Sequence, residues 1–473
     1  MTRSRTSSGA AGDLLLEIRR DLPEPLHRQI EAAIRDAIRA GRLRHGAALP
    51  STRTLAADLG VSRGVVVEAY QQLVAEGYLT SQAGGYTQVA IEPRPAAAPE
   101  PEPVPAKPPI DFGYGRADVS NFPRAAWLRS IRRMVMEAPS HWFNYGSGRG
   151  VPALRDALSG YLNRVRGTDA VADDMVITSG YGQGVALVLQ VIRESGARRL
   201  AVEDPSSGDD AVPVGRALGL EVVGVPVRDD GIDVDALRRS DADAVVLTPS
   251  HQWPLGGVLS AESRAAVLDW ANRRGAVVIE DDYDAEYRYD RSPIGAMQGL
   301  APDHVVHAGS VSKTLAPGLR IGWLVVPHHL TDAVAEAKIL ADRGSPAIEQ
   351  LAFADFLNRG EFDRHLRRMR PVYRRRRDAL LEALREQLPD FEPIGASAGI
   401  HLVAWLPADL DEGSVVAAAA RHGVGVPGVR PYRLTDPGRD GLIFGYSSLN
   451  ERSIADGIRL LAAAVADLRD RPT

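Results

Sequence analysis

The sequence predicts an α/β protein built from two parts that a proline-rich segment joins. Residues 14–91 show short helical periods followed by two β-type runs, residues 92–109 are dominated by proline, and residues 110–473 alternate apolar β-branched runs with helical stretches. Such alternation is typical of a mostly parallel sheet covered by helices. We therefore expect a small helical module and a large α/β domain, the latter divided into a larger part (about 150–330) and a smaller part (about 331–473).

Composition indicates a soluble globular protein and excludes several chemistries. The 473 residues are 44% apolar, include no cysteine and carry a net charge of −5. Without cysteine there is no disulfide, thiolate zinc site or cysteine nucleophile. Because no apolar run reaches membrane-spanning length and the first residues lack a signal-peptide core, we expect a cytoplasmic protein without membrane attachment. The first 90 residues carry a net +2 and the remainder −7, so any DNA would meet a local charge unlike the total.

Three helical periods open the module. The first is predicted to begin after Pro25 and to end at Gly41, the second covers 52–59, and the third runs from the cap residue Ser62 to Gly77. The second and third are joined by a short turn, which is typical of a helix-turn-helix whose second helix enters the major groove of DNA. Two β-type runs around adjacent glycines follow and predict a hairpin, or wing.

The module resembles the GntR-type winged helix. The matching residues lie in three stretches, Leu49–Ala56, Leu59–Arg63 and Ala69–Tyr78. The resemblance implies binding to double-stranded promoter DNA through residues at the helix starts: Arg53, Ser62, Arg63 and Gly64. Arginine suits this role because its guanidinium makes paired hydrogen bonds to guanine or phosphate, although these arginines could instead only solvate a helical bundle. Gln82-Ala83 stands where the family often has a basic residue, so we expect weak phosphate binding by the wing.

Residues 92–109 form the linker. Their prolines exclude a helix or a sheet interior and predict an extended spacer of about 3.1 Å per residue. Such a spacer would tether the DNA-binding module and set its effective concentration at a second DNA half-site. A spacer without that role would have the same composition.

Apolar runs in the last part predict the strands of the sheet. They cover residues 175–178, 200–202, 221–225, 244–247, 276–279, 304–307 and 321–326. Helical stretches such as 262–274 fill the intervals. Ligands bind such folds at the carboxyl ends of the strands, so the residues that follow each run are the candidates for chemistry.

Two strand ends offer groups that suit a phosphate and an amine. Small residues over 179–184 open a helix and leave amides free for a phosphate, although a tight turn explains them equally well. The stretch 309–323 places Lys313 between two serines with Arg320 beyond them. A lysine in that setting can form an imine with an aldehyde cofactor while hydroxyls and guanidinium hold its phosphate. A structural lysine near a turn is the alternative.

Two other strand ends carry carboxylates and a polar rim. The rim covers 248–257, and the acidic cluster Glu280–Asp284 follows the run 276–279. Clustered carboxylates are costly to bury without partners, and either a metal ion or a cationic pyridine nitrogen would supply one. Alternation along a strand directs Asp281 and Asp282 to opposite faces, which disfavours a metal site made from Asp281, Asp282 and Asp284.

Together these motifs resemble the fold-type I, aminotransferase-like domains that bind pyridoxal 5′-phosphate (PLP). Glu203-Asp204-Pro205 and Tyr145-Gly146 match as well. The joining of such a domain to a GntR-type module resembles the MocR subfamily of bacterial transcriptional regulators, which includes pyridoxine-regulating members.

The resemblance implies a role for each residue of the site. Lys313 would hold PLP as a Schiff base, Asp281 would keep the pyridine nitrogen protonated, and Tyr283 would meet the ring hydroxyl. The remaining contacts would come from residues around the phosphate (Ser310, Ser312, Arg320 and the amides of Tyr181 and Gly182) and from the pocket wall (His251 and Gln252). A buried structural role suits His251 equally well.

Two positions depart from the family pattern. Ser207 stands where relatives place an aromatic residue over the cofactor ring, and Ile443 stands where aminotransferases place the arginine that grips the substrate carboxylate. Arg430 or Arg433 are candidates to replace that arginine. An apolar side chain cannot supply a two-hydrogen-bond clamp, so we expect little or no transaminase activity.

These features favour a PLP-dependent transcriptional regulator over an enzyme. The signal would be PLP itself or an amine that reacts with bound PLP, and either must bind two arrangements of the protein with different affinity. The alternative is an active aminotransferase that carries a DNA-binding appendage. Because domains of this type usually build their sites at a two-fold interface, we expect a homodimer, which would also present two winged helices to two half-sites.

Overall fold

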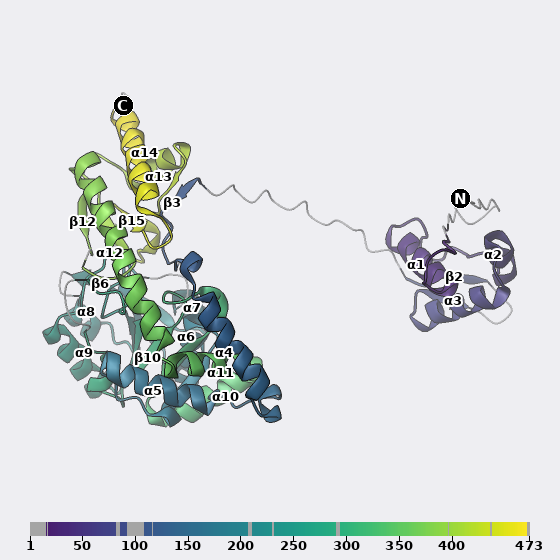
Figure 1. The fold of residues 1–473 in the computed structure, drawn as a ribbon, viewed down its shortest axis with the longest axis horizontal. Coiled ribbons are helices and arrows are strands. Elements are labelled where there is room, and N and C mark those ends of the chain that lie inside the picture. Colours follow the sequence, from purple (N-terminus) through teal and green to yellow (C-terminus); the bar gives the residue numbers. More distant parts are fainter. Residues whose placement is uncertain are drawn as a thin grey trace. The chain divides into compact units, whose positions relative to one another are not determined.

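The chain folds into two compact units, Met1–Pro105 and Ala106–Thr473, which Figure 1 shows as ribbons. The computed structural model describes residues 16, 18–81, 86–91, 108–115, 117–206, 211–228, 231–289, 294–395, 397–435 and 438–470. The expectations for Gln82-Ala83, for Ser207 and for most of the linker lie outside these residues.

The first unit contains the expected helix-turn-helix and hairpin. Its elements are α1 (Leu26–Arg39), α2 (Thr52–Leu59), α3 (Arg63–Ala75) and the antiparallel strands β1 (Leu79–Ser81) and β2 (Thr87–Val89). Ser51 caps α2 by accepting a hydrogen bond of 3.1 Å from the Thr54 amide, and Gly60 ends α2 in the left-handed conformation. The apolar faces of the helices meet in a core that includes Ile34, Leu55 and Leu73.

The second unit is organised around a mixed eight-stranded sheet in the order β4-β11-β10-β9-β8-β5-β6-β7. Its strands are β4 (Met175–Thr178), β5 (Arg199–Asp204), β6 (Glu221–Arg228), β7 (Gly231–Ile232), β8 (Ala244–Leu247), β9 (Val277–Asp282), β10 (Val305–Ser310) and β11 (Gly322–Val325). All seven strands expected from apolar runs are present. The pairs from β10 through β9, β8 and β5 to β6 are parallel, whereas β11 is antiparallel to both of its neighbours. The mostly parallel sheet is thereby confirmed.

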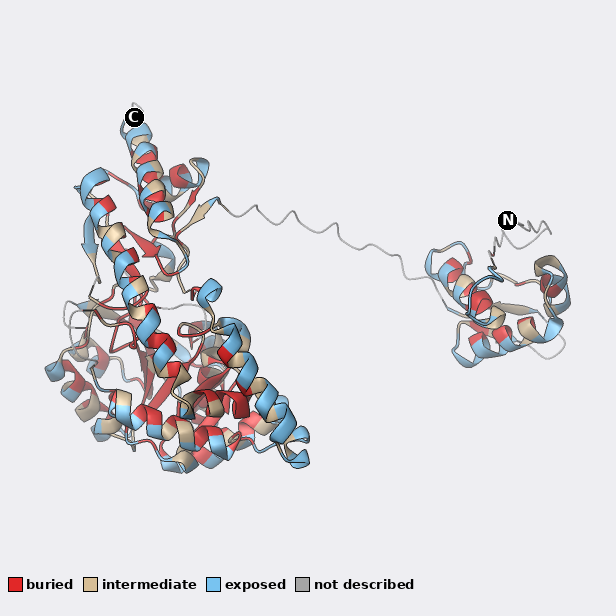
Figure 2. Cartoon of the chain, viewed as in Figure 1, coloured by how far each residue is buried: buried red, intermediate tan, exposed pale blue. Residues whose placement is uncertain are grey.

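Helices cover both faces of this sheet. They are α4 (Arg124–Glu137), α5 (Pro152–Arg166), α6 (Tyr181–Glu194), α7 (Ala211–Ala217), α8 (Val234–Arg239), α9 (Ala261–Arg274), α10 (His328–Asp342) and α11 (Ala347–Asn358). Apolar residues of α6, α7 and α10 pack on one face, and those of α8 and α9 join a separate core. Figure 2 shows the outcome: the strands are buried, and the helices are buried on their inner sides and exposed on their outer sides.

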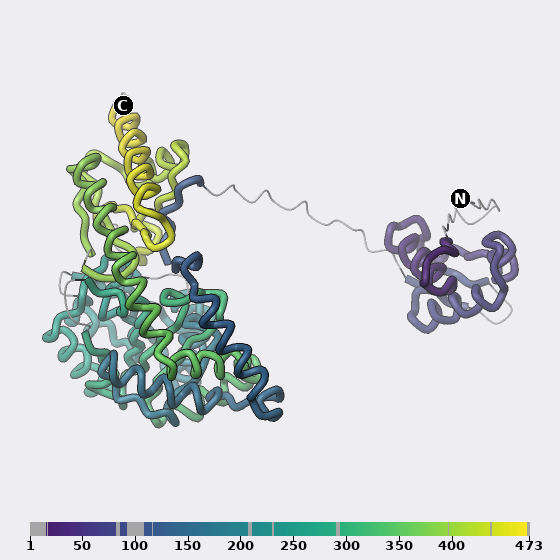
Figure 3. Tube along the Cα trace, in the orientation of Figure 1, coloured from purple at the N-terminus to yellow at the C-terminus, as the bar shows by residue number. Residues whose placement is uncertain are grey.

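A smaller antiparallel sheet follows in the C-terminal part. Its strands are β12 (Glu392–Ile394), β13 (His401–Trp405) and β15 (Gly441–Gly445), accompanied by α12 (Glu361–Gln387), α13 (Glu412–Arg421) and α14 (Glu451–Arg469). The start of the unit also packs here, because β3 (Ile110–Asp111) pairs with β14 (Val424–Gly425). Figure 3 shows this early segment beside the C-terminal one. In contrast, α10 and α11 pack against α4, α5 and α6 of the larger part. None of the described helices is long and apolar enough to cross a membrane.

Candidate functional site

The candidate site lies at one edge of the large sheet. Strands β4, β5, β8, β9 and β10 run in the same direction, so their carboxyl ends meet there. The helix after β4, the rim after β8, the acids that end β9 and the lysine after β10 are thereby brought to one edge. Asp281 pairs in register with Ala308 of β10, and Ala308 is five residues before Lys313 in the sequence.

A cavity opens at this edge. Its lining includes Tyr181, Glu203, Thr248, Trp253 and Asp281. Tyr181 and Asp281, which the sequence assigns to opposite ends of the cofactor, therefore face one space. Asp281 is half-buried.

Glu203 brings a second carboxyl group to the cavity. It is fully buried, and burial raises its pKa to about 7. Hydrogen bonds from the amide and hydroxyl of Thr248, at 3.0 and 2.8 Å, oppose that rise because they favour the charged form. Sequence reasoning used Glu203 only as part of a matching motif and missed this position.

Lys313 follows β10 and is half-buried. Its Nζ donates a hydrogen bond of 2.6 Å to the carbonyl of Gly115, in the segment that follows β3. Gly115 has φ +76°, and a Cβ at this position would stand 3.0 Å from the Lys313 Nζ. The site thus holds the lysine amine against a residue 198 positions earlier in the chain, a contact that no sequence pattern indicated.

The residues expected at the phosphate gather around the start of α6. Gly180 is the N-cap residue of α6, and the first backbone amides of a helix point out of its N-terminus. The guanidinium of Arg320 lies over Gly180, since a Cβ on that glycine would be 3.1 Å from its Nη1. Ser310 ends β10 and accepts a 3.4 Å hydrogen bond from the Ser312 amide. Backbone amides, hydroxyls and a guanidinium form a donor set that fits a phosphate group.

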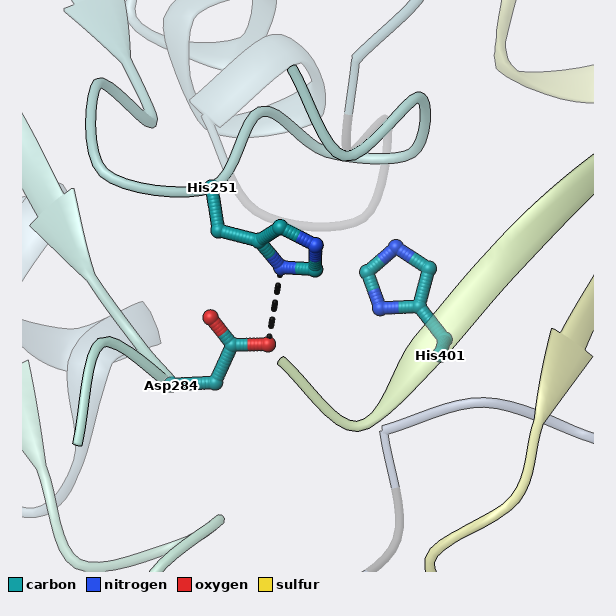
Figure 4. Close-up of side chains that lie close together, drawn as sticks. All are labelled: His251, Asp284 and His401. Atoms are coloured by element: carbon teal, nitrogen blue, oxygen red, sulfur yellow. Dashed lines mark hydrogen bonds and ion pairs between the residues drawn. The ribbon is translucent and has the colours of Figure 1, made fainter. Parts of the chain in front are cut away.

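Three side chains, His251, Asp284 and His401, form a buried polar cluster (Figure 4), and Tyr283 contacts it through His251. The Tyr283 hydroxyl donates to the His251 carbonyl at 2.9 Å and lies 3.0 Å from His251 Nδ1. The same Nδ1 is 3.0 Å from Asp284 Oδ2. His401, from β13, faces this pair and bonds through Nε2 to the Pro254 carbonyl at 3.0 Å. Burial lowers the pKa of His401 well below its ordinary value.

Ligand atoms of His251, Asp284 and His401 lie within 4.8 Å of one another, close enough to consider a metal ion. His251 Nδ1 and Asp284 Oδ2 already contact each other, and His401 Nε2 bonds to a carbonyl. The contacts of His251 are those of a buried, hydrogen-bonded histidine that supports Tyr283. Gln252 is also buried, and its amide bonds to the Pro205 and Trp253 carbonyls.

The neighbouring acids of β9 have structural partners. Glu280 accepts hydrogen bonds from the amides of Met297 and Gln298. Asp282 forms a two-contact ion pair with Arg166, at 2.7 and 3.0 Å, and both side chains are buried. Because side chains alternate along a strand, Asp281 alone of this run faces the cavity.

The late strand offers no clamp for a carboxylate. Ile443 lies in β15, fully buried, opposite Val403 of β13. Arg430 is held by Asp411 at 2.9 Å and by Asp440 at 2.7 Å on the surface. Arg433 donates to the carbonyl of Arg439 at 3.0 Å. Neither arginine is therefore arranged as the missing clamp.

Comparison with known proteins identifies the family. The "Aminotransferase class I and II" family matches residues 107–439, and "Bacterial regulatory proteins, gntR family" matches residues 26–89. The chain is 32% identical to the probable rhizopine catabolism regulatory protein MocR of Rhizobium meliloti, over 95% of this chain and 96% of that protein. It is 30% identical to the pyridoxine biosynthesis transcriptional regulator PdxR of Corynebacterium glutamicum, over 96% and 98%.

The chain belongs to the MocR subfamily of GntR-type transcriptional regulators. Its second unit also resembles an archaeal alanine:glyoxylate aminotransferase, with a TM-score of 0.70 and 28% identity over 77% of this chain and 92% of that one. A MocR-type regulator acts on transcription by binding DNA through its GntR-type unit.

The first unit of this MocR-type regulator exposes the residues expected to meet DNA. Arg53 is the second residue of α2, and Arg63 is the first residue of α3. Ser62 caps α3 by position without a side-chain hydrogen bond, and Gly64 follows Arg63. All four are exposed, and the Arg63 Nε bonds to Thr52 Oγ1 at 3.4 Å.

Proposed function

We propose that this MocR-type regulator binds PLP at Lys313, and that occupation of this site controls its binding to promoter DNA. The cavity that Tyr181 and Asp281 share carries the proposal. The phosphate of PLP bound there would face Tyr181, and its protonated ring nitrogen would face Asp281. The signal is PLP, or an amine that reacts with bound PLP. Genes of vitamin B6 metabolism are one candidate target, since the relative PdxR is named for pyridoxine biosynthesis. A promoter target also supports a cytoplasmic location.

Each residue would have a defined task. PLP, when bound, supplies an aldehyde and an aromatic ring able to accept electrons. The Lys313 amine would bind the aldehyde carbon, and the Asp281 carboxylate would hold a proton on the ring nitrogen. Arg320, Ser310 and Ser312, together with the amides of Tyr181 and Gly182, would bind the phosphate. Tyr283 would hydrogen bond to the ring hydroxyl, oriented by its contacts with His251.

The Lys313–Gly115 hydrogen bond suggests how occupation is transmitted. An amine bound to an aldehyde carbon keeps fewer protons than an ammonium group, so it is a poorer donor to the Gly115 carbonyl. Gly115 belongs to the segment that leads from the linker through β3. Occupation of the site would therefore act on the segment that connects to the DNA-binding unit.

Signal binding fits the site better than turnover. Ile443 is buried in the core, and Arg430 is held by two aspartates, so neither of these residues supplies a clamp for a substrate carboxylate. An active aminotransferase with a DNA-binding appendage is the alternative. Sustained conversion of an amino donor and a keto acid by purified protein, at a rate above that of free PLP, would favour it.

A homodimer is part of the proposal. Large apolar side chains are exposed on α4, on α10 and around the short helix η2 (Ser140–Phe143): Leu128, Val135, Met136, Phe143, Tyr145 and Leu340. Exposed apolar groups gathered on neighbouring elements are typical of an interaction surface. A second copy on this surface would give the protein two winged helices.

The test combines cofactor attachment with DNA binding. The sequence holds only Lys107, Lys313 and Lys338, and Lys338 is buried in an ion pair with Asp342. Borohydride reduction of the PLP-loaded protein followed by peptide mapping should mark Lys313. Lys313→Ala should lose the visible absorbance of bound PLP. It should also lose the effect of PLP on the affinity of the protein for the DNA upstream of its own gene. Lys107→Ala, the matched control, should keep both. A wild-type protein that takes up no PLP would overturn the proposal.

A further inference from the structure

Helix α12 concentrates positive charge in its first half. Between Arg364 and Arg377 it contains eight arginines and neither aspartate nor glutamate. The remainder of the second unit has the opposite balance, because residues 91–473 together carry a net −7. A helix face that is merely solvated usually mixes both signs of charge, whereas a run of one sign is typical of a surface that meets a charged partner.

The arginines form a row on the solvent side of the helix. The inner side packs into the core through Leu366, Met369 and Tyr373. From residue 364 to residue 375 every exposed position except Pro371 is an arginine, and one side of α12 is accordingly exposed in Figure 2. These exposed residues, the α12 arginine row, are Arg364, Arg367, Arg368, Arg374 and Arg375. Because they are spaced by three, four and seven positions, they share one face of the helix.

The middle of the row has no carboxylate partner. Arg368 donates a hydrogen bond of 2.8 Å to the carbonyl of Asn121, and Arg374 donates one of 2.5 Å to the carbonyl of Tyr289. Arg367 makes neither a hydrogen bond nor an ion pair within the part of the chain that the structure describes. A carbonyl is an uncharged acceptor, so the charges of all three guanidinium groups stay uncompensated.

The carboxylates beside the row are already occupied. They pair with arginines at its two ends and on α5: Glu361 with Arg364, Asp363 with Arg164, and Glu451 with Arg375. The excess positive charge therefore lies between Arg367 and Arg374. Over these residues the helix rises about 10 Å. Duplex DNA carries about six phosphates over the same length.

We propose that the α12 arginine row binds the phosphate backbone of DNA that flanks the sequence held by the first unit. Guanidinium groups pair with phosphate oxygens, and such contacts do not depend on the base sequence. The linker at 92–109 spans at most about 56 Å when extended, so DNA on the first unit is at a high local concentration around the second. The second unit is thus a DNA-binding part of the regulator as well as its sensor. The proposal rests on DNA binding by the first unit and is independent of PLP at Lys313.

The experiment measures the affinity of the full-length protein for duplexes of increasing length around one site, which in vitro selection with the wild-type protein supplies. Wild type should bind the longest duplex at least tenfold more tightly than the shortest that it saturates. The triple variant Arg367→Gln, Arg368→Gln and Arg374→Gln should lose most of this gain and keep its affinity for the shortest duplex. On the longest duplex, its slope of log affinity against log salt concentration should be smaller by at least about 2, since each lost phosphate contact contributes about 0.9.

A control variant removes the same charge elsewhere. Arg198→Gln, Arg238→Gln and Arg273→Gln replace three exposed arginines outside α12 and should leave the affinities and the slope unchanged. If the first triple variant folds poorly by circular dichroism, Arg367→Glu replaces it, because Arg367 has no hydrogen bond to lose among the described residues. It should weaken binding to the longest duplex at least threefold and leave the shortest unaffected.

Three results would overturn the proposal. The first is a wild-type gain with duplex length that persists in the triple variant or in Arg367→Glu, as expected if the row meets an acidic protein instead of DNA. The second is an equal loss in the control variant, which would make the effect one of net charge. The third is a change of oligomeric state in sedimentation velocity on substitution of the row, which would place it between two copies of the chain.

Discussion

Asp281 and Asp282 are adjacent residues of β9, and we expect substitution of Asp282 to lower stability and substitution of Asp281 to weaken PLP binding. Asp282 is paired with Arg166 through two contacts of 2.7 and 3.0 Å, with side chains 5% and 1% exposed. Arg166 also donates to Ser250 Oγ at 3.0 Å. Asp282→Asn removes the charge that compensates this buried guanidinium, and the estimated cost is about 3–5 kcal/mol of unfolding free energy. That is more than a hundredfold in the unfolding equilibrium.

The same substitution at Asp281 should cost little stability. Asp281 is half-buried and lines the cavity, so Asp281→Asn should lower the free energy of unfolding by about 1 kcal/mol or less in the cofactor-free protein. It should instead weaken PLP retention and alter the absorbance of the bound cofactor, because an amide cannot hold the ring nitrogen protonated. The two variants differ by one position and share the same chemical change, so each controls for the other.

Urea denaturation monitored by tryptophan fluorescence measures the free energy of unfolding of the second unit in each variant. A double variant, Arg166→Met with Asp282→Leu, should recover most of the loss, because it removes both charges. The interpretation is refuted if Asp282→Asn costs less than about 1 kcal/mol, or if the double variant is as unstable as the sum of the single ones.

Three further predictions concern DNA, pH and assembly. If the Arg63 guanidinium reads a base, Arg63→Ala should weaken promoter binding by about 1–3 kcal/mol. If it binds phosphate instead, the substitution should reduce the slope of log affinity against log salt concentration by about 0.9. A salt titration measures both quantities, and the control Arg28→Ala on α1 should change neither. The folded pKa of Glu203, about 7, lies above its ordinary 4.5, so its stabilisation is present below pH 4.5 and is lost as pH rises through 7. Between pH 5 and 8 the free energy of unfolding of Glu203→Gln should therefore increase relative to that of the cofactor-free wild type. A difference that stays constant with pH would contradict this. Phe143→Asp should produce monomers in sedimentation velocity, whereas Leu300→Asp, at a similarly exposed position elsewhere, should not; a dimeric Phe143→Asp protein would place the interface on another surface.

Local patterns were sufficient to predict the strands and the helix-turn-helix. The apolar runs predicted seven of the eight strands of the large sheet to within a few residues, although they did not predict β7 or the strands of the small sheet. The cap residue Ser62 marked the start of α3, because a cap also depends on neighbouring residues. The order of the strands at one sheet edge then brought Tyr181 and Asp281 together, as parallel strands require.

Contacts between distant segments could not be predicted in this way. Lys313 meets Gly115 across 198 positions, and Asp282 meets Arg166 across 116. Neither Gly115 nor Arg166 stands in a pattern that indicates its partner, because the pairing depends on how α5 and the segment after β3 pack on the sheet.

Through Gly115, the Lys313 site contacts the segment of chain that follows the linker, which an isolated cofactor pocket would not do. In the sequence, the linker ends immediately before β3, and β3 is fixed to the small sheet by its pairing with β14. A few residues later the same segment accepts the Lys313 hydrogen bond. The chain that leads to the DNA-binding unit is thus anchored once by a strand and once by the lysine. Under the proposal that PLP binds at Lys313, a change in the state of this amine would alter the second anchor directly.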